Sequence, residues 1–484
     1  MKYIISIILL VSVFSTNLFS QGYKIKVKVE GIKDTICYLA NYYGDKQYYK
    51  DTASVDKNGY MEFTGKKPLE GGIYSVVIPG MKYFEIIVNE QNFSVETDTT
   101  NLIYNLKVKG SEENRLFYEY LRYLDDKQKI SAGLREKYQK SESEEDKKKY
   151  QEELSKIDAD VKAFRIGYIN NHSDKFVGKL FKSMSEPEIP EAPEGVDKDK
   201  FNYYYFKNHF WDNVDFSDAR LLRCPVYHNK LKQYFEQLVV SHPDSIIKEA
   251  EFVVSRAKAD PEIFKYTVVY LTSNYERSKI MGMDAVFVHM ALNYYCKGFT
   301  PWADSAQVNK ICDRAKTLDP LLLGKVAQDL TLVDTTGKVW QNLHSVDASY
   351  TILVFWDPDC GHCKKEIPKL VEVYKKLKDK GVKVYAVSSE ENTEWKKFIR
   401  EKEMDFINVA VPKAVYKDQK MATELVLSGV TDIKSLNYHN TYDIFSTPQI
   451  YLLDKDKKIV AKRLEAEQLE KLLLELMKRD GEGK

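Results

Sequence analysis

The segment YTILVFWDPDCGHCKKEIP, residues 350–368, decides the fold of the last third of this chain. Its first seven residues form an apolar run typical of a buried strand, and a basic stretch with helical spacing follows a short polar turn. Cys360 and Cys363 lie three positions apart where the predicted strand passes into the predicted helix. Such a pair can transfer electrons, bind a metal or close a structural disulfide.

The position of Cys360 at the start of a helix favours its reactive form. Unpaired amide N–H groups of the first turn and the positive end of the helix dipole face its sulfur, and both stabilise a thiolate. The thiolate is the nucleophile in disulfide exchange. Cys363, one turn further on, can then attack the mixed disulfide and release the partner. The pair is therefore predicted to exchange thiols and disulfides.

Neighbouring side chains are candidates for tuning this chemistry. A protonated His362 would stabilise the Cys360 thiolate, while Asp357 and Asp359 would oppose it; the alternative for His362 is a solvent-exposed spacer. Glu366 is placed to exchange a proton with the second thiol, although an ordinary surface glutamate fits the same position.

The other cysteines argue against a zinc site. Structural zinc takes four ligands, typically from two Cys-x-x-Cys pairs, and Cys37, Cys224, Cys296 and Cys312 form no second pair. A purely structural disulfide is disfavoured because so short a loop constrains the unfolded chain little. No metal and no bound cofactor are expected. The four other cysteines are expected to be buried and free, or paired in a way that the sequence does not resolve.

Length and composition limit the class of protein. A chain of 484 residues with 43% hydrophobic residues predicts two to four domains with substantial cores. Its 73 basic and 72 acidic residues nearly balance, which argues against a general nucleic-acid binder.

The N-terminus predicts export. Lys2 precedes the apolar run IISIILLVSVF, residues 4–14, and small and polar residues follow it up to a predicted cleavage site near Ser20. The run is shorter than the roughly 20 apolar residues that span a bilayer. Residues 1–20 are therefore predicted to be a signal peptide. The mature protein is expected in the periplasm or cell envelope, without stable membrane insertion.

After the signal segment, the pattern of apolar and polar residues changes twice along the chain, which predicts a multidomain protein. Residues 21–108 are predicted to form an antiparallel β domain, because YKIKVKVE (23–30) alternates and FEIIVNEQNFSVET (84–97) has the pattern of a hairpin. Residues 109–318 are predicted to be α-helical. Residues 319–484 alternate short strands and helices, which predicts an α/β domain.

The helical region carries an apolar stripe at heptad-like spacing. This pattern predicts a helix that packs against its neighbour across a polar turn at residues 141–149, in preference to a partner-binding arm. The stripe consists of Tyr150, Leu154, Ile157, Val161, Phe164 and Tyr168.

Residues 324–477 resemble the thioredoxin fold of TlpA-like thiol:disulfide oxidoreductases. The resemblance rests on GKVAQDLTLVDTTGK (324–338), ILVFWDPDCGHCKKEIP (352–368) and YDIFSTPQIYLLDKDKKI (442–459). It implies that Cys360 attacks and Cys363 resolves. It also implies a cis peptide bond between Thr447 and Pro448, beside the cysteine pair. Supporting roles are expected for these two residues and for Trp356, His362 and Glu366.

The sequence departs from that family at several places. Val354 occupies a position that is acidic in thioredoxin itself, so a buried proton relay would need another group. Residues 413–440 resemble an insertion, which either shapes a substrate groove or decorates the fold. The related peroxiredoxins need Thr or Ser three positions before the reactive cysteine, and Asp357 stands there. Peroxidase activity is therefore not expected.

The predicted function is a secreted thiol:disulfide oxidoreductase that acts on envelope proteins. Its expected partners are protein thiols and disulfides and an upstream redox partner. The alternative is a non-enzymatic envelope binding or scaffold protein in which the thioredoxin fold serves as an adaptor. The direction of electron flow and the oligomeric state are left open, because CGHC resembles oxidising enzymes while the surrounding frame resembles reductants.

Overall fold

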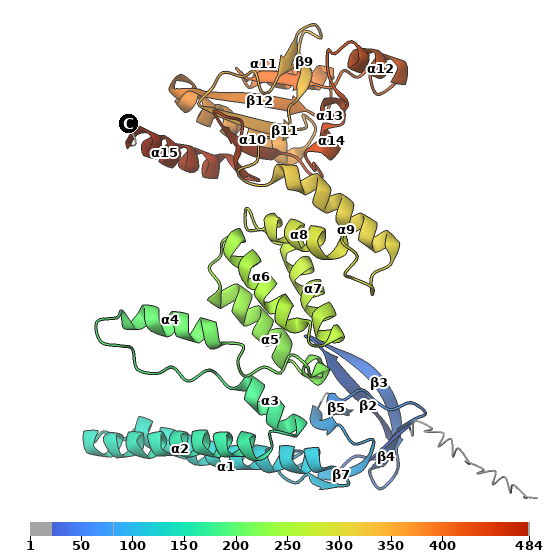
Figure 1. The fold of residues 1–484 in the computed structure, drawn as a ribbon, viewed down its shortest axis with the longest axis vertical. Helices are drawn as coiled ribbons and strands as arrows, with labels where there is room; N and C mark the ends of the chain where they lie inside the picture. Colours follow the sequence, from blue (N-terminus) through green and yellow to red (C-terminus); the bar gives the residue numbers. More distant parts are fainter. Residues whose placement is uncertain (1–21, 81, 483–484) are drawn as a thin grey trace, which may run out of the picture. The chain divides into compact units, whose positions relative to one another are not determined.

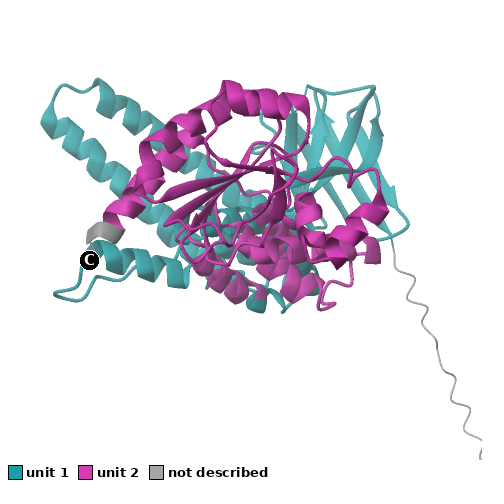
Figure 2. Cartoon of the chain, turned by 90° about the horizontal axis from the view of Figure 1, so that it is seen from above, with its two compact units in different colours: residues 1–239, 255–266 teal, residues 240–254, 267–484 magenta. Residues whose placement is uncertain are grey.

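The computed structural model describes residues 22–80 and 82–482, so the predicted signal peptide lies outside the described residues. Two compact units make up the chain (Figure 2). One contains residues 1–239 and 255–266, and the other contains residues 240–254 and 267–484. In the described part of the chain, no helix is both long and apolar enough to cross a membrane. The domain boundaries expected near residues 108 and 318 stay predictions.

The N-terminal region forms two four-stranded sheets, with orders β4-β1-β7-β8 and β3-β2-β5-β6 (Figure 1). The alternating pattern of the first strand has its predicted effect, since Ile25, Val27 and Val29 are all buried. Among the described strands of these sheets, β1 and β7 pair in parallel and the other pairs are antiparallel. The strands are β1 (Tyr23–Glu30), β2 (Thr35–Tyr43), β3 (Lys46–Val55), β4 (Tyr60–Gly65), β5 (Gly72–Ile78), β6 (Lys82–Val88), β7 (Asn92–Asp98) and β8 (Lys107–Lys109).

The hairpin predicted over residues 84–97 is wrong. Two strands form there, but β6 pairs with β5 in one sheet and β7 pairs with β1 in the other. Phe93 and Val95 register with Ile25 and Val27, so the buried face of β7 continues that of β1. A pattern of two strands and a turn specifies local extended structure, whereas the partner of each strand depends on distant residues.

The middle of the chain is α-helical, as predicted. Its helices are α1 (Glu112–Lys140), α2 (Glu144–Asn171), α3 (Phe176–Met184), α4 (Lys198–His209), α5 (Val226–Gln233), α6 (Pro243–Ala257), α7 (Pro261–Glu276), α8 (Asp284–Met290) and α9 (Ser305–Leu318).

The heptad-like stripe lies on α2 and packs against α1, as predicted. The rings of Tyr123 and Phe164 stack with centroids 3.7 Å apart, and the Tyr168 hydroxyl donates to the Leu116 carbonyl at 2.6 Å. The polar turn predicted over residues 141–149 is shorter than expected, because α2 begins at Glu144; the Ser143 side chain caps this helix by accepting from the Asp146 amide. These contacts bury Tyr168 and half-bury the other residues of the stripe within one helical hairpin.

The C-terminal region is an α/β layer around a seven-stranded sheet of order β10-β9-β13-β12-β11-β14-β15. The strand β11 (Tyr350–Trp356) is parallel to β12 (Val382–Ser388) and antiparallel to β14 (Gln449–Asp454). The other strands are β9 (Thr331–Asp334), β10 (Trp340–Asn342), β13 (Ile407–Ala410) and β15 (Ile459–Lys462), and the larger helices are α10 (Gly361–Leu377), α11 (Thr393–Glu401), α12 (Gln419–Leu427) and α15 (Ala466–Glu482).

All seven residues of β11 are buried because both faces of the sheet are covered. Ile352, Val354 and Trp356 face a core formed with α10 and α15. Leu353 and Phe355 face a second core on the opposite side, which includes Tyr residues that follow α12 in the chain. This double burial explains why the strand reads as a continuous apolar run.

The two parts of the insertion at residues 413–440 differ in how deeply their side chains are buried. The helix α12 has no fully buried residue. Beyond it, Tyr438 belongs to the second core, and the Thr431 hydroxyl donates to the Thr331 carbonyl at 2.7 Å. The second part is therefore a structural component of the domain.

We expect the substitution Ile352→Ala to destabilise the protein by about 2–5 kcal/mol, because it leaves a cavity in the first core. Thermal unfolding followed by calorimetry measures the effect. Leu427→Ala on α12 is the matched control, since its side chain is 81% exposed and its loss should change stability by less than about 0.5 kcal/mol. Equal shifts for the two variants would contradict the packing described here.

Candidate active site

The two cysteines lie at the junction between β11 and α10, as predicted. β11 ends at Trp356, and Cys360 is the residue immediately before the first turn of α10. The Cys360 amide donates to the Asp357 carbonyl at 3.2 Å, and the Lys364 amide donates to the Cys360 carbonyl at 3.0 Å. These two bonds fix the backbone so that Cys363 falls in the first helical turn.

The two thiols are free and differ in environment. Cys360 is partly exposed, whereas Cys363 is fully buried. The backbone N–H of Cys363 lowers the pKa of Cys360, and bonds with Thr447, the His362 amide and the Cys363 thiol act in the same direction, while burial opposes them. Burial raises the pKa of Cys363 to about 11. At neutral pH the exposed sulfur is therefore the more reactive one.

Cys363 is held within the first core. Its sulfur accepts a hydrogen bond from the Asp357 amide at 3.4 Å, and it packs in the same cluster as Trp356 and Ile367. The Trp356 ring is fully buried and contacts the Phe398 ring at 5.2 Å between centroids. Trp356 thus lies beneath the cysteine pair as a packing residue.

The peptide bond between Thr447 and Pro448 is cis, as the family resemblance implied. The Cys360 sulfur lies 3.4 Å from the Thr447 carbonyl oxygen, to which the thiol donates. Residues 87 positions apart in the sequence thus meet at the reactive sulfur.

A groove of about 550 Å³ lies beside the cysteine pair and includes both His362 and Glu366 in its lining. His362 is exposed. The groove is further lined by Asp443, Phe445, Ser446, Thr447, Pro448, Gln449, Ile450, Arg463, Leu464 and Glu465. An open groove next to an exposed thiol can admit an extended segment of another protein.

Glu366 is tied to other groups in the groove. Its carboxylate accepts from Lys369 Nζ at 2.9 Å and from the Ala466 amide at 3.3 Å. The bond with Lys369 is the main cause of its lowered pKa. Glu366 is therefore charged at neutral pH, and its proton exchange with the second thiol stays a prediction.

No sequence pattern indicates the buried ion pair that lies at the groove. Asp443 is buried, and its carboxylate meets Arg314 of α9 at 2.7 Å and Arg463 at 3.6 Å. Burial raises the pKa of Asp443, and the two arginines oppose that effect. Arg314 lies 129 positions from Asp443 along the chain, so no local pattern could connect them.

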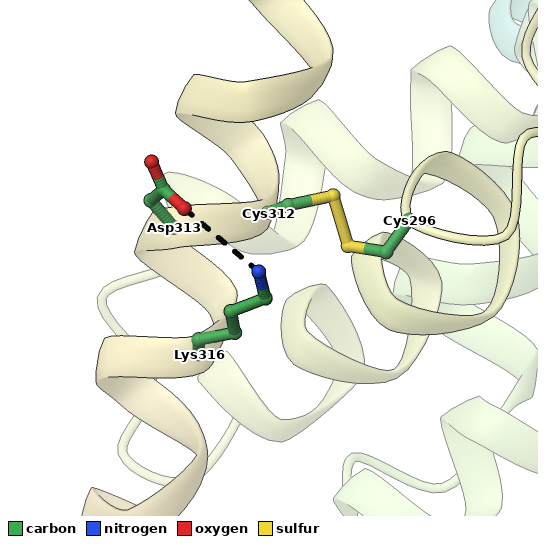
Figure 3. Close-up of a disulfide and its surroundings, with 4 residues drawn as sticks. All are labelled: Cys296, Cys312, Asp313 and Lys316. Carbon is green, nitrogen blue, oxygen red and sulfur yellow. Dashed lines mark ion pairs between the residues drawn. A yellow bond between two sulfur atoms is a disulfide. The ribbon is translucent and has the colours of Figure 1, made fainter.

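A disulfide joins Cys296 to Cys312 of α9, with Cα atoms 5.7 Å apart (Figure 3). Cys37 and Cys224 are free and buried, and burial raises their pKa to about 11 and about 12. Both predicted alternatives therefore occur: Cys37 and Cys224 are buried and free, whereas Cys296 and Cys312 are disulfide-bonded. Among the described residues, no group of three or more His, Cys, Asp or Glu side chains is placed to hold a metal ion.

Two thiols of unequal pKa, next to a cis-proline on this sheet, are suited to thiol–disulfide exchange, and the chain is a thioredoxin-like oxidoreductase. Comparison with known families supports that class. Residues 323–462 match the AhpC/TSA family, and residues 134–319 and 23–117 match the domains of unknown function DUF5106 and DUF4369.

Individual proteins and solved structures are similar to parts of this chain. The thiol-disulfide oxidoreductase ResA of Bacillus cereus is 28% identical over 145 residues, which is 30% of this chain and 70% of that protein. A domain of a possible thiol-disulfide isomerase from Cytophaga hutchinsonii is 40% identical, with 34% of this chain and 99% of that chain covered and a TM-score of 0.27. A thioredoxin-like protein from Bacteroides caccae is 19% identical, with 60% and 97% covered and a TM-score of 0.43.

The C-terminal third of the chain is thus similar to the AhpC/TSA family and to thiol-disulfide oxidoreductases, and the two domains of unknown function precede it.

We expect alkylation by iodoacetamide to distinguish the two active-site thiols. Because its pKa is lowered, Cys360 should react at neutral pH faster than an ordinary cysteine, and Cys363 should react much more slowly. Peptide mass spectrometry of the reduced protein over a pH series measures both rates.

The Cys363→Ala variant is the control for this alkylation experiment, because it leaves the amide that lowers the Cys360 pKa in place. A Cys360 rate that rises with pH like that of a free thiol would contradict the described environment.

Proposed function

We propose that the protein is an exported thiol:disulfide oxidoreductase that exchanges disulfides with envelope proteins through the couple formed by Cys360 and Cys363. The observation that supports this most is the Cys360 thiol, which is partly exposed, has a lowered pKa and lies 3.4 Å from the Thr447 carbonyl beside an open groove.

In the reducing direction, the Cys360 thiolate attacks one sulfur of a substrate disulfide. The substrate S–S bond breaks, a mixed disulfide forms, and the first substrate thiolate leaves and takes up a proton. Cys363 then loses its proton and attacks the Cys360 sulfur, which breaks the mixed disulfide and releases the second substrate thiolate. Two electrons pass to the substrate, and the couple ends as a disulfide.

The oxidising direction is the reverse of these steps. In either direction, an upstream redox partner has to restore the couple, since one turnover changes its oxidation state. Thr447 and Pro448 are proposed to align the substrate backbone at the Cys360 sulfur. His362, at the groove, is proposed to stabilise the thiolate, and Glu366 to assist proton exchange with Cys363.

Two observations support an extracytoplasmic location. The first is the export pattern of the N-terminal segment. The second is the disulfide between Cys296 and Cys312, since such bonds persist mainly in oxidising compartments.

We expect the Cys363→Ala variant to accumulate mixed disulfides with envelope proteins, because the second attack can no longer occur. Expression of a tagged variant in a bacterial host, acid quenching and non-reducing electrophoresis detect the adducts. Reduction should release them.

The Cys360→Ala variant is the matched control and should form no adducts through the couple. If Cys363→Ala forms none either, and the wild-type protein does not reduce insulin disulfides, the proposed function is wrong.

A further inference from the structure

Two residues that line the groove beside Cys360 are contacted by a residue from outside the segment that matches the AhpC/TSA family. Arg314 lies on α9, before residue 323, where the match to the AhpC/TSA family begins. Its guanidinium donates to Asp443 at 2.7 Å and lies 5.1 Å from the centre of the Phe445 ring. One side chain thus contacts two residues of the loop that leads to Pro448.

The first contact fixes the start of that loop. Asp443 has a backbone φ of 55°, a left-handed conformation that is uncommon for residues other than glycine, and its side chain is buried. Two arginines, Arg314 and Arg463, compensate its charge. A buried carboxylate needs such partners, so the position of Arg314 is coupled to the conformation of the loop.

The second contact concerns an exposed aromatic ring. Phe445 is 81% exposed, although it lines the groove and lies two residues before Thr447, whose carbonyl contacts the Cys360 sulfur. A single exposed apolar residue is ordinary on a protein surface. Phe445 differs because it lines the same groove as Thr447, which contacts the Cys360 sulfur, and because a cation lies against its ring.

The helix that carries Arg314 is itself held in place. Cys312, two positions earlier, is bonded to Cys296, and Ala315 and Leu318 are buried. Because the helix is fixed, Arg314 loses little conformational entropy when it contacts the Phe445 ring. It is therefore suited to hold that ring in one position.

We propose that Phe445 contacts an aromatic or large apolar side chain next to the reacting cysteine of the substrate protein, and that Arg314 is a positioning residue which holds the Phe445 ring. This inference rests on the proposed function. A substrate sulfur must reach bonding distance of Cys360, so the residues flanking it enter the groove that Phe445 lines.

The charges of the groove favour this occupant over a charged one. Glu366 is paired with Lys369, and Asp443 is paired with Arg314, so these carboxylates are already compensated. The exposed ring offers a flat apolar face on which another ring can stack.

The test uses two disulfide-bonded peptides that differ only in Phe or Ser next to one cysteine. With dithiothreitol supplied to restore the reduced couple after each turnover, the wild-type protein should reduce the Phe peptide with a higher kcat/KM than the Ser peptide. In Phe445→Ala, this ratio should fall about 3- to 10-fold, the range for an aromatic pair. Leu427→Ala, which removes an equally exposed apolar side chain from α12, should keep the wild-type ratio. An unchanged ratio in Phe445→Ala would overturn the proposal.

The role of Arg314 is tested with Arg314→Lys, which keeps a charge near Asp443 but lacks the planar group over the ring. It should raise KM for the Phe peptide while kcat is retained and the alkylation profile of Cys360 is unchanged. A fall in kcat with an unchanged KM, or an altered alkylation profile, would show a merely structural role and overturn this part.

Reduction of oxidised glutathione distinguishes a failure of the proposed function from a failure of the proposal about Phe445. If the wild-type protein reduces neither it nor the peptides, the proposed function fails and this inference fails with it. If turnover is normal and only the ratio is insensitive to Phe445→Ala, this inference alone fails.

Discussion

The chemistry of this protein depends on the amide groups at the start of α10. The N–H of Cys363 is the main cause of the lowered pKa of Cys360, and the same turn places Cys363 in the core, where burial raises its own pKa. One helical turn thus separates a partly exposed thiol of lowered pKa from a buried thiol of raised pKa.

The sheet makes that turn rigid. β11 lies between β12 and β14 and is covered by a core on each face, and its last residue, Trp356, is buried in the first of them. The antiparallel partner β14 begins one residue after Pro448. The strand that leads to Cys360 and the strand that follows the cis bond are therefore hydrogen-bonded neighbours, which brings Thr447 to the Cys360 sulfur.

Local patterns in the sequence are sufficient to predict much of this arrangement. The apolar run before Cys360 predicted β11, and the spacing after it predicted α10, because both features depend on neighbouring residues. Pairings between distant residues were beyond such patterns. The parallel pairing of β1 with β7, the bond between Cys296 and Cys312, and the contact of Arg314 with Asp443 each depend on tertiary packing. The cis bond before Pro448 was predicted only through a family resemblance.

The parallel pairing of β1 with β7 has a consequence for how the protein reaches its folded state. β1 is an inner strand of its sheet, flanked by β4 and β7, although it is the first strand of the described chain. During synthesis it emerges before either neighbour, and the apolar row formed by Ile25, Val27 and Val29 then has no sheet to cover it. Until Asn92–Asp98 follows, this uncovered apolar row is open to aggregation or to binding by a chaperone.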